Sequence, residues 1–430
     1  MSISHKMIPT PNTGDHTLTL TPRKQEPAAR LQPPPQAMDD LIPGLPEDLA
    51  RECLARLGFD QLPTARRVSR AWKSELESPF HHRLRRPRPL LALAQAHPPL
   101  AAFGPARKYA AAATGHHSYR LVLHDPAGGT WTPLPPLPDT GGGGGGGGLP
   151  LFCRLAAVGD GDGPAATKLV VLGGWDTETW APTAAVHVYD FLTGAWRRGV
   201  DMPPPRRSFF ACAAAAGGKV FVAGGHDEEK NALRCAAAYD AAADTWVALP
   251  DMARERDEPR GVAIFDAAGE RFVAVGGYAT EAQGRFAGSA EAFDTAAWTW
   301  GPVRERVIED GACPRTCCAA AGGGGAGSGM TMMYMLDGGR VMVRDGAAGE
   351  GEGGGAWREL ARVPEDVREA AAEVVAIGDG RVAVVGACLG GEQAVYVLSH
   401  GGAAGTSSWT RNAAPAEFAG HVQAACCVHI

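Results

Sequence analysis

Short runs of apolar residues, separated by glycine, proline and aspartate, follow one another from about residue 90 to residue 428. Apolar runs of this kind, bounded by turn residues, predict β-strands. A tryptophan stands near the end of each of six successive segments, at intervals of about 50 to 65 residues. The six are Trp131, Trp196, Trp246, Trp300, Trp357 and Trp409. A pattern that repeats at this period predicts the stacked blades of a β-propeller.

The segments share a second set of positions, which predicts how each blade is built. An apolar run ends in a glycine pair at 170–174, 220–225 and 272–277. Glycine tolerates the positive φ of the turn that follows such a strand. In four segments an aspartate six residues before the tryptophan predicts a tight turn before the last strand. These aspartates are Asp125, Asp190, Asp240 and Asp294, and the last three follow an aromatic residue.

Four strands per blade are predicted where the repeat is complete. They are 151–158, 168–173, 185–191 and 195–198 in the second blade, 208–215, 219–224, 235–240 and 245–249 in the third, and 260–265, 271–276, 289–294 and 298–302 in the fourth. The fifth and sixth blades are degraded. Each keeps its tryptophan and an apolar run, at 332–336 and 381–387.

The first blade lacks an innermost strand on its N-terminal side, where the strand-like runs are 90–94, 119–124 and 130–134. The C-terminal run 421–428 resembles the innermost strands of the other blades. We therefore expect it to return and complete blade one. That pairing would remove the exposed edges that an open ring would leave.

Residues 41–86 have helical periodicity instead. Pro46 suits a first helical position, and Glu47 and Asp48 favour the positive end of a helix dipole. Gly58 is expected to end this helix, and a second is predicted from Pro63–Thr64 to Pro79. Their apolar stripes are Leu49, Cys53, Leu54 and Leu57, then Ala65, Val68, Trp72 and Leu76. So short a segment cannot build a good core alone. Its apolar faces therefore either cap the propeller or dock another protein.

Composition narrows the remaining possibilities. Residues 1–38 are polar and proline-bearing, and we expect a disordered N-terminal extension, because such a segment cannot offset its ordering entropy. It has no apolar stretch typical of a secretory signal. The ten cysteines include no CxxC pair. Without a signal they indicate reduced, buried thiols in an intracellular protein, placed in the cytoplasm, the nucleus or both.

Several partner and site classes find no support in the sequence. The net charge of −6 does not favour nucleic-acid or membrane binding, and there is no apolar run of about 18 residues that would span a bilayer. The glycine tracts 141–148, 322–329 and 349–355 are not followed by Gly-Lys-Ser/Thr, so we interpret them as loop insertions, not phosphate loops. The basic stretch 81–88 is either a nuclear or nucleic-acid signal or, as we favour, a solvated helix end.

No catalytic residues, metal ligands or cofactor site are predicted. The histidines do not stand at His-x-Glu or HExxH spacing, and there is no GxSxG nucleophile elbow. Cys313, Cys317 and Cys318 lie close together, but a metal site would need further ligands from elsewhere.

The helical segment resembles an F-box. The resemblance rests on Leu45-Pro46-Glu47-Asp48-Leu49, on Val68 and on Ser69-Arg70-Ala71-Trp72. In F-boxes these positions bind a Skp1-like adaptor. The adaptor-binding candidates that the resemblance implies are Leu45, Pro46, Leu49, Leu54, Leu57, Val68 and Trp72.

The chain from Leu41 to Cys427 resembles plant F-box/kelch-repeat proteins, and the repeats are kelch-like. The implied fold is an all-β six-bladed kelch β-propeller at 87–430, with blade one closed by 421–428, preceded by a small all-α F-box module at 39–86. Stretches such as 206–213, 223–233 and 249–258 are similar to one plant subgroup. Its members are substrate receptors of SCF-type ubiquitin ligases and target phenylalanine ammonia-lyase, in phenylpropanoid biosynthesis, or cytokinin response regulators for degradation by the proteasome.

In kelch propellers, the loops after the glycine pairs and the loops between blades emerge on the same face. Here these loops combine aromatic and arginine residues with carboxylates, a composition typical of protein-binding hot spots. The target-binding candidates are Trp175, Arg206, Arg207, His226, Asp227, Arg254, Arg256, Asp257 and Tyr278. Alternatively, these charges pair with one another and contribute little.

The resemblance implies a receptor without catalytic activity of its own. Its expected partners are a Skp1-like adaptor, a cullin reached through that adaptor, and a target protein. Two other functions stay open: an adaptor-independent protein-interaction propeller, and a small-molecule-binding or enzymatic propeller. A deep polar central cavity with clustered arginines would favour the last.

Overall fold

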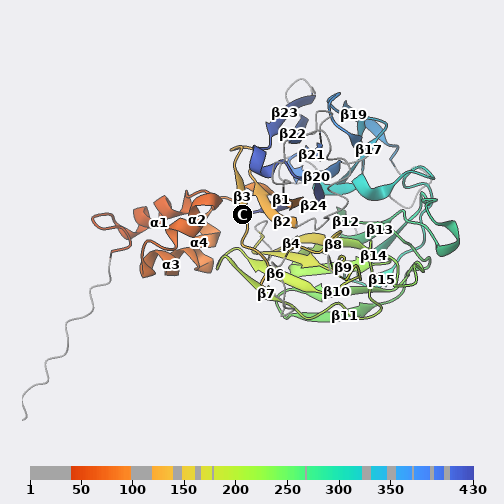
Figure 1. The fold of residues 1–430 in the computed structure, drawn as a ribbon, viewed down its shortest axis with the longest axis horizontal. Coiled ribbons are helices and arrows are strands. Elements are labelled where there is room, and N and C mark those ends of the chain that lie inside the picture. The colour runs from red at the N-terminus through yellow and green to blue at the C-terminus, as the bar shows by residue number, and fades with distance from the viewer. Residues whose placement is uncertain are drawn as a thin grey trace, which may run out of the picture.

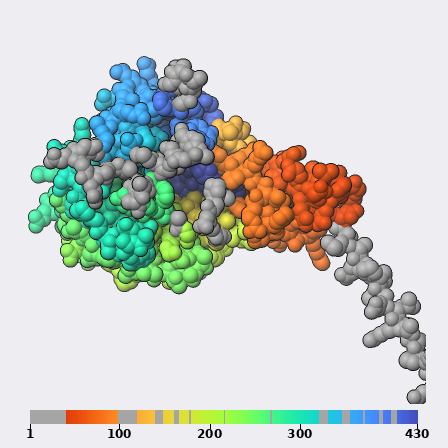
Figure 2. Space-filling model, turned by 180° about the vertical axis from the view of Figure 1, so that it is seen from behind, coloured from red at the N-terminus to blue at the C-terminus, as the bar shows by residue number. Residues whose placement is uncertain are grey.

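The computed structural model describes residues 40–97, 119–138, 148–159, 166–176, 179–266, 269–321, 331–345, 355–369, 372–387, 392–400 and 407–430. The predicted extension 1–38 lies outside these ranges, as do the three glycine tracts except for Gly148 and Gly355. Figure 1 shows two parts: a lobe of short helices, and a ring of β-sheets beside it. In the space-filling view of Figure 2 the helical lobe projects from the rim of the ring.

The helical lobe consists of four α-helices and one short 3₁₀-helix. They are α1 (Glu47–Ala55), η1 (Phe59–Gln61), α2 (Leu62–Ala65), α3 (Arg70–Leu76) and α4 (Pro79–Leu84). Their small core is formed by Leu54, Leu62, Ala65 and Leu76, with Leu41, Leu57, Phe59 and Trp72 packed against it.

The predicted second helix is in fact two separate helices, α2 and α3. The chain is extended at Ser69, with φ −155°, and the Ser69 side chain accepts a hydrogen bond from the Trp72 amide. Ser69 is therefore the N-cap of α3, because a serine hydroxyl satisfies an amide that has no helical partner. Pro79 begins α4 instead of ending a helix, since a first-turn proline loses no hydrogen bond. Likewise, α1 ends at Ala55, before Gly58.

The ring consists of six four-stranded antiparallel sheets, so the predicted six-bladed propeller is confirmed. Blades one to three are β24 (Val422–His429), β1 (Pro89–Ala96), β2 (Tyr119–His124) and β3 (Trp131–Pro133); β4 (Arg154–Val158), β5 (Lys168–Leu172), β6 (Val186–Asp190) and β7 (Ala195–Arg198); and β8 (Ala211–Ala215), β9 (Lys219–Ala223), β10 (Ala236–Asp240) and β11 (Thr245–Leu249). Blades four to six are β12 (Arg260–Asp266), β13 (Gly269–Val275), β14 (Ala290–Asp294) and β15 (Thr299–Trp300); β16 (Cys318–Ala321), β17 (Thr331–Asp337), β18 (Arg340–Asp345) and β19 (Arg358–Arg362); and β20 (Glu373–Gly378), β21 (Arg381–Ala387), β22 (Gln393–His400) and β23 (Ser407–Ala413).

The C-terminal strand closes the ring. β24 pairs antiparallel with β1, from Pro89 opposite His429 to Gln95 opposite Val422. It also contacts β20 of blade six and β4 of blade two. The predicted return of 421–428 to blade one is thus observed.

Five of the six tryptophans join neighbouring blades. Each indole Nε1 donates a hydrogen bond to a backbone carbonyl in the segment that follows the last strand of the preceding blade, or at that strand's end. The pairs are Trp196 to Pro135 at 2.8 Å, Trp246 to Val200 at 2.9 Å, Trp300 to Pro250 at 2.7 Å, Trp357 to Val307 at 2.8 Å and Trp409 to Arg362 at 2.9 Å. The spacing of the tryptophans therefore follows from one contact per blade junction.

The geometry that the blades share also explains the positions of the aspartates and glycines. Asp190 Oδ1, for example, accepts the amides of Leu192 and Thr193 at 2.8 and 2.9 Å, closing the turn before β7. At Gly225, where φ is +83°, an added Cβ would lie 2.2 Å from the Ser208 carbonyl oxygen. Only glycine fits a position that combines this φ with so close an approach.

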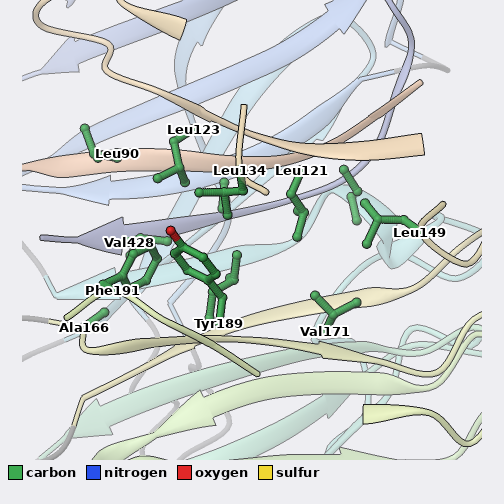
Figure 3. Close-up of a cluster of buried hydrophobic side chains, with 14 of the residues drawn as sticks. Leu90, Leu121, Leu123, Leu134, Leu149, Ala166, Val171, Tyr189, Phe191 and Val428 are labelled. Carbon is green, nitrogen blue, oxygen red and sulfur yellow. The ribbon is translucent and has the colours of Figure 1, made fainter. Parts of the chain in front are cut away.

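The core lies between adjacent blades. Figure 3 shows the junction of blades one and two, where Leu90, Leu121, Leu123 and Val428 face Tyr189 and Phe191. Side chains from the two ends of the propeller region thus share one apolar cluster.

The fifth blade departs from the repeat. Its glycine pair, Gly338-Gly339, forms the tight turn between β17 and β18, with φ +55° and +73°. In blades two to four the pair instead precedes a longer loop on the predicted target-binding face. Blade five therefore contributes no such loop at this position.

Candidate functional site

The helical lobe presents five exposed apolar side chains, which we call the docking set. They are Leu45, Leu49, Val68, Phe80 and Leu84, exposed by 36%, 50%, 58%, 49% and 41%. Pro46, also among the predicted adaptor-binding residues, is exposed as well. Scattered apolar residues are normal on a surface, but five on a lobe of this size form an unusual concentration.

Three of the predicted adaptor-binding residues lie elsewhere. Leu54 is 1% exposed and belongs to the core of the lobe, so its assignment to the surface is corrected. Leu57 and Trp72 are partly buried against the same core, and Trp72 Nε1 donates to the Leu41 carbonyl at 2.6 Å. The apolar positions in the sequence include residues from both faces of the helices. Those on the inner face pack within the core of the lobe.

Phe80 and Leu84 were not among the predicted residues. Both belong to α4, which the sequence analysis did not recognise as a helix. Its start carries a recognisable signal, since Ser78 caps it and Pro79 occupies the first turn.

A different side of the lobe is fastened to the propeller. Arg66 Nη2 donates to the carbonyls of Phe191 and Leu192, at 2.9 and 2.7 Å, in the turn between β6 and β7. The rings of Phe59 and Phe191 meet edge to face, with centroids 5.8 Å apart. A groove of about 660 Å³ runs between the lobe and blade one, lined in part by Arg56, Arg85 and Asp125. Of the docking set, Leu84 lines this groove, whereas Leu45, Leu49, Val68 and Phe80 do not.

On the propeller, the predicted target-binding residues divide into buried and exposed groups. Arg207 and Arg256 are each only 2% exposed. Arg207 Nη1 donates to the carbonyls of Gly224 and Cys235, at 3.3 and 2.8 Å. Arg256 Nη1 donates to Gly276 and Ser289, at 2.7 and 3.1 Å, and its Nε lies 3.2 Å from Glu291 Oε1. Burial lowers the pKa of both guanidinium groups. Their assignment to a surface is corrected: they hold their own blades together.

The sequence contained a signal for this structural role. Arg207 and Arg256 occupy the same place in consecutive repeats. Each donates to the carbonyl of the first glycine of its blade's pair and to the carbonyl of the residue just before the third strand of that blade. A polar residue that recurs at the same position in successive repeats is expected to stabilise the blade. They were instead predicted to be surface residues, because the loops that contain them are rich in charged and aromatic side chains.

His226, Asp257 and Tyr278 are also buried, at 5%, 4% and 7% exposure, which corrects their assignment as surface contacts. His226 Nδ1 lies 2.9 Å from the Asp257 carboxylate, so the loop of blade three reaches the loop that leads into blade four. Lys230 Nζ lies 3.0 Å from His226 Nε2. Tyr278 donates its hydroxyl to Glu258 at 3.1 Å, and burial followed by the nearby Asp257 and Glu258 charges raises the Tyr278 pKa.

Trp175, Arg206, Asp227 and Arg254 remain available at the surface, fully or in part. Trp175 Nε1 donates to Ser208 Oγ at 2.6 Å, and Lys230 Nζ lies 4.3 Å from the centre of its ring. Arg254 forms an exposed ion pair with Glu305 at 2.6 Å. A groove of about 450 Å³ between blades three and four is lined in part by Arg234, Arg254 and Tyr278.

An aromatic patch on the same face escaped prediction. Phe209 lies between Phe152 and Trp175, with ring centroids 5.1 and 6.4 Å away. Phe152 is 45% exposed. Phe152 and Phe209 have φ of +56° and +54° at equivalent positions, two residues before β4 and β8. Glu258, two residues before β12, has a similar φ of +52°, so this conformation recurs with the blade repeat. Nothing in the residue types signals this conformation.

The two arginines of the blade-four loop should respond differently to substitution. We expect Arg256→Ala to lower the free energy of unfolding by about 3–5 kcal/mol, because Glu291 would keep a buried, uncompensated charge. Arg254→Ala should cost under about 1 kcal/mol, since its ion pair is exposed. Urea unfolding followed by tryptophan fluorescence measures both. Equal losses for the two variants would show that Arg256 is not a structural residue.

Metal and membrane sites were also sought. Within the described ranges, no group of three or more His, Cys, Asp or Glu side chains is placed to hold a metal ion. None of the helices in the described part of the chain combines the length and apolar character needed to cross a bilayer.

Comparison with known proteins matches both parts of the chain. The F-box domain matches residues 42–83, and the KLHDC2/KLHL20/DRC7 Kelch-repeats domain matches residues 156–340. This chain is 39% identical to the F-box/kelch-repeat protein At1g80440 of Arabidopsis thaliana. The 403 aligned residues cover 91% of this chain and all of that relative. At1g15670 of the same plant is 37% identical with the same coverage, and SKIP20 is 34% identical over 61% of this chain and 66% of its own. This chain, a helical lobe with an exposed apolar docking set carried on a six-bladed propeller, therefore belongs to the F-box/kelch-repeat protein family.

Proposed function

We propose that this protein is the target receptor of an SCF-type ubiquitin ligase. The observation that carries the proposal is the docking set, whose five apolar side chains are 36% to 58% exposed although the lobe is anchored to the propeller by Arg66 and Phe59. A Skp1-like adaptor would bury these apolar side chains, and a cullin would join through the adaptor. The domain at 39–86 would then bind the adaptor, and the domain at 87–430 would bind the target.

The propeller face would bind the target. The aromatic patch and the exposed or half-exposed Arg206, Asp227 and Arg254 supply anchors and charges of the kind that dominate protein interfaces. The receptor makes and breaks no bond itself. It raises the effective concentration of target lysines near the ubiquitin-conjugating enzyme. Phenylalanine ammonia-lyase and cytokinin response regulators are the first targets to test, in the cytoplasm and the nucleus.

Reconstitution tests the proposal. The purified chain, a Skp1-like adaptor, a cullin–RING core and phenylalanine ammonia-lyase should yield ubiquitinated lyase only when the chain is present, and a response regulator serves as the second candidate. Phe152→Ala should reduce target modification while adaptor capture stays unchanged, because Phe152 lies on the propeller face. Failure of the chain to bind any Skp1-like adaptor would contradict the proposal and favour an adaptor-independent interaction propeller.

A further inference from the structure

The innermost strands of the six blades surround a common axis. β24, β4, β8, β12, β16 and β20 each contact the next innermost strand around the ring. Arg154, Arg260 and Glu373 are the first residues of β4, β12 and β20, in alternate blades. Three charged side chains thus start strands at the same end of the axis, the end at which the aromatic patch lies.

Two of these side chains are held in the same way. Arg154 Nε donates to the Phe210 carbonyl at 3.0 Å, and Arg260 Nε donates to the Cys317 carbonyl at 3.0 Å. Each carbonyl belongs to the residue just before the innermost strand of the next blade. The Nε atom of each arginine is therefore used for positioning, and the two Nη atoms remain for other partners.

The cluster carries more positive than negative charge. Glu373, with its side chain 3% exposed, lies 3.1 Å from Arg315 Nε and 3.7 Å from Arg260 Nη1. One carboxylate thus serves two guanidinium groups, while Arg154 has a carbonyl partner at Nε. Burial lowers the pKa of Arg154, and the nearby Arg260 charge lowers it further. Three arginines against one glutamate leave a surplus of two positive charges among these four side chains.

The aromatic patch borders this cluster. Phe152 and Phe209 lie two residues before the first residues of β4 and β8. Both have a positive φ, at the point where the chain enters these innermost strands. The Phe152 amide donates to Gln423 Oε1 of β24 at 2.7 Å. Arg154 and Arg260 are half-buried residues, and the Arg260 side chain is 17% exposed.

We propose that the axial cluster of Arg154, Arg260, Arg315 and Glu373 binds an oxyanion, a carboxylate or a phosphate, beneath the aromatic patch. Planar guanidinium groups match such oxygens with two parallel hydrogen bonds. The anion would supply the negative charge that Glu373 provides only in part. This site deepens the proposed function, since it lies on the target-binding face. Its binding is measured without adaptor, so its failure would leave the ligase proposal untouched.

Calorimetric titration of the full chain tests the site, with inorganic phosphate and with a hexaglutamate peptide as probes. Arg154→Gln should weaken anion binding by about tenfold or more, because a charge-assisted hydrogen bond is lost. Glu373→Gln should strengthen it severalfold, because an internal competitor is removed. Arg362→Gln, at an arginine 84% exposed on the outer strand β19, is the matched control and should change nothing.

The two probes distinguish the sources of the anion. Tighter binding of hexaglutamate than of phosphate, with hexaglutamine inert, would assign the site to an acidic segment of a protein. Binding of phosphate alone would assign it to a free small anion. The proposal is overturned if neither probe binds, or if Arg154→Gln and Glu373→Gln shift the affinity in the same direction while both variants keep the wild-type melting temperature.

Discussion

A chain in which Leu45 and Leu49 are both alanine is expected to lose capture of a Skp1-like adaptor by about a hundredfold while keeping its melting temperature. The two side chains are 36% and 50% exposed, so their truncation costs the folded state little. At a protein interface, anchoring apolar residues contribute more than about 1 kcal/mol each, and about 3 kcal/mol together corresponds to this loss. Pulldown with purified adaptor and differential scanning fluorimetry measure the two quantities.

Two single variants frame this experiment. Leu54→Ala removes a side chain that is 1% exposed and should destabilise the lobe by about 2–5 kcal/mol, so adaptor loss would follow from unfolding. Val247→Ala, at a side chain 46% exposed on the propeller, should alter neither quantity. Full adaptor capture by the Leu45 and Leu49 double variant would remove these residues from the interface.

Deletion of residues 421–430 is expected to abolish cooperative unfolding of the propeller and to cause aggregation on warming. The deletion removes β24, which pairs with β1 from Pro89 to Gln95. Blade one would then expose an unpaired strand edge and the apolar cluster around Leu90 and Val171. An exposed apolar edge is a template for association with other chains. Scanning calorimetry together with light scattering measures both effects.

A peptide is expected to replace the missing strand in trans. A synthetic peptide covering 419–430 should reduce the aggregation of the shortened chain, and a scrambled peptide of the same composition should not. An unchanged melting transition after the deletion would mean that the ring does not depend on this pairing.

The propeller was predictable because a few residues repeat for local physical reasons. Trp246 and Trp300 each close one blade junction, and Asp190 caps one turn, so their spacing records the blade directly. The return of β24 was predictable because one blade lacked a strand. The break at Ser69 was not predicted, because the apolar spacing continues across it and hides the cap.

The target-binding face was predicted less well, for reasons that sequence patterns do not contain. Arginine is usually a surface residue, and the burial of Arg256 depends on carbonyls that tertiary contacts bring to it. Phe152 and Phe209 look like ordinary core residues in the sequence. Only the left-handed backbone before each innermost strand brings these rings together at the surface.

The closure of blade one sets an order of events during synthesis. β1 leaves the ribosome early and must wait for β24, made more than three hundred residues later, before its edge is paired. The helical lobe precedes both strands and has its own small core. Because domains form as units during translation, the nascent chain can offer its lobe to an adaptor while the ring is still incomplete. Chaperones that shield β1 in this interval would then act on a chain whose helical lobe has already formed.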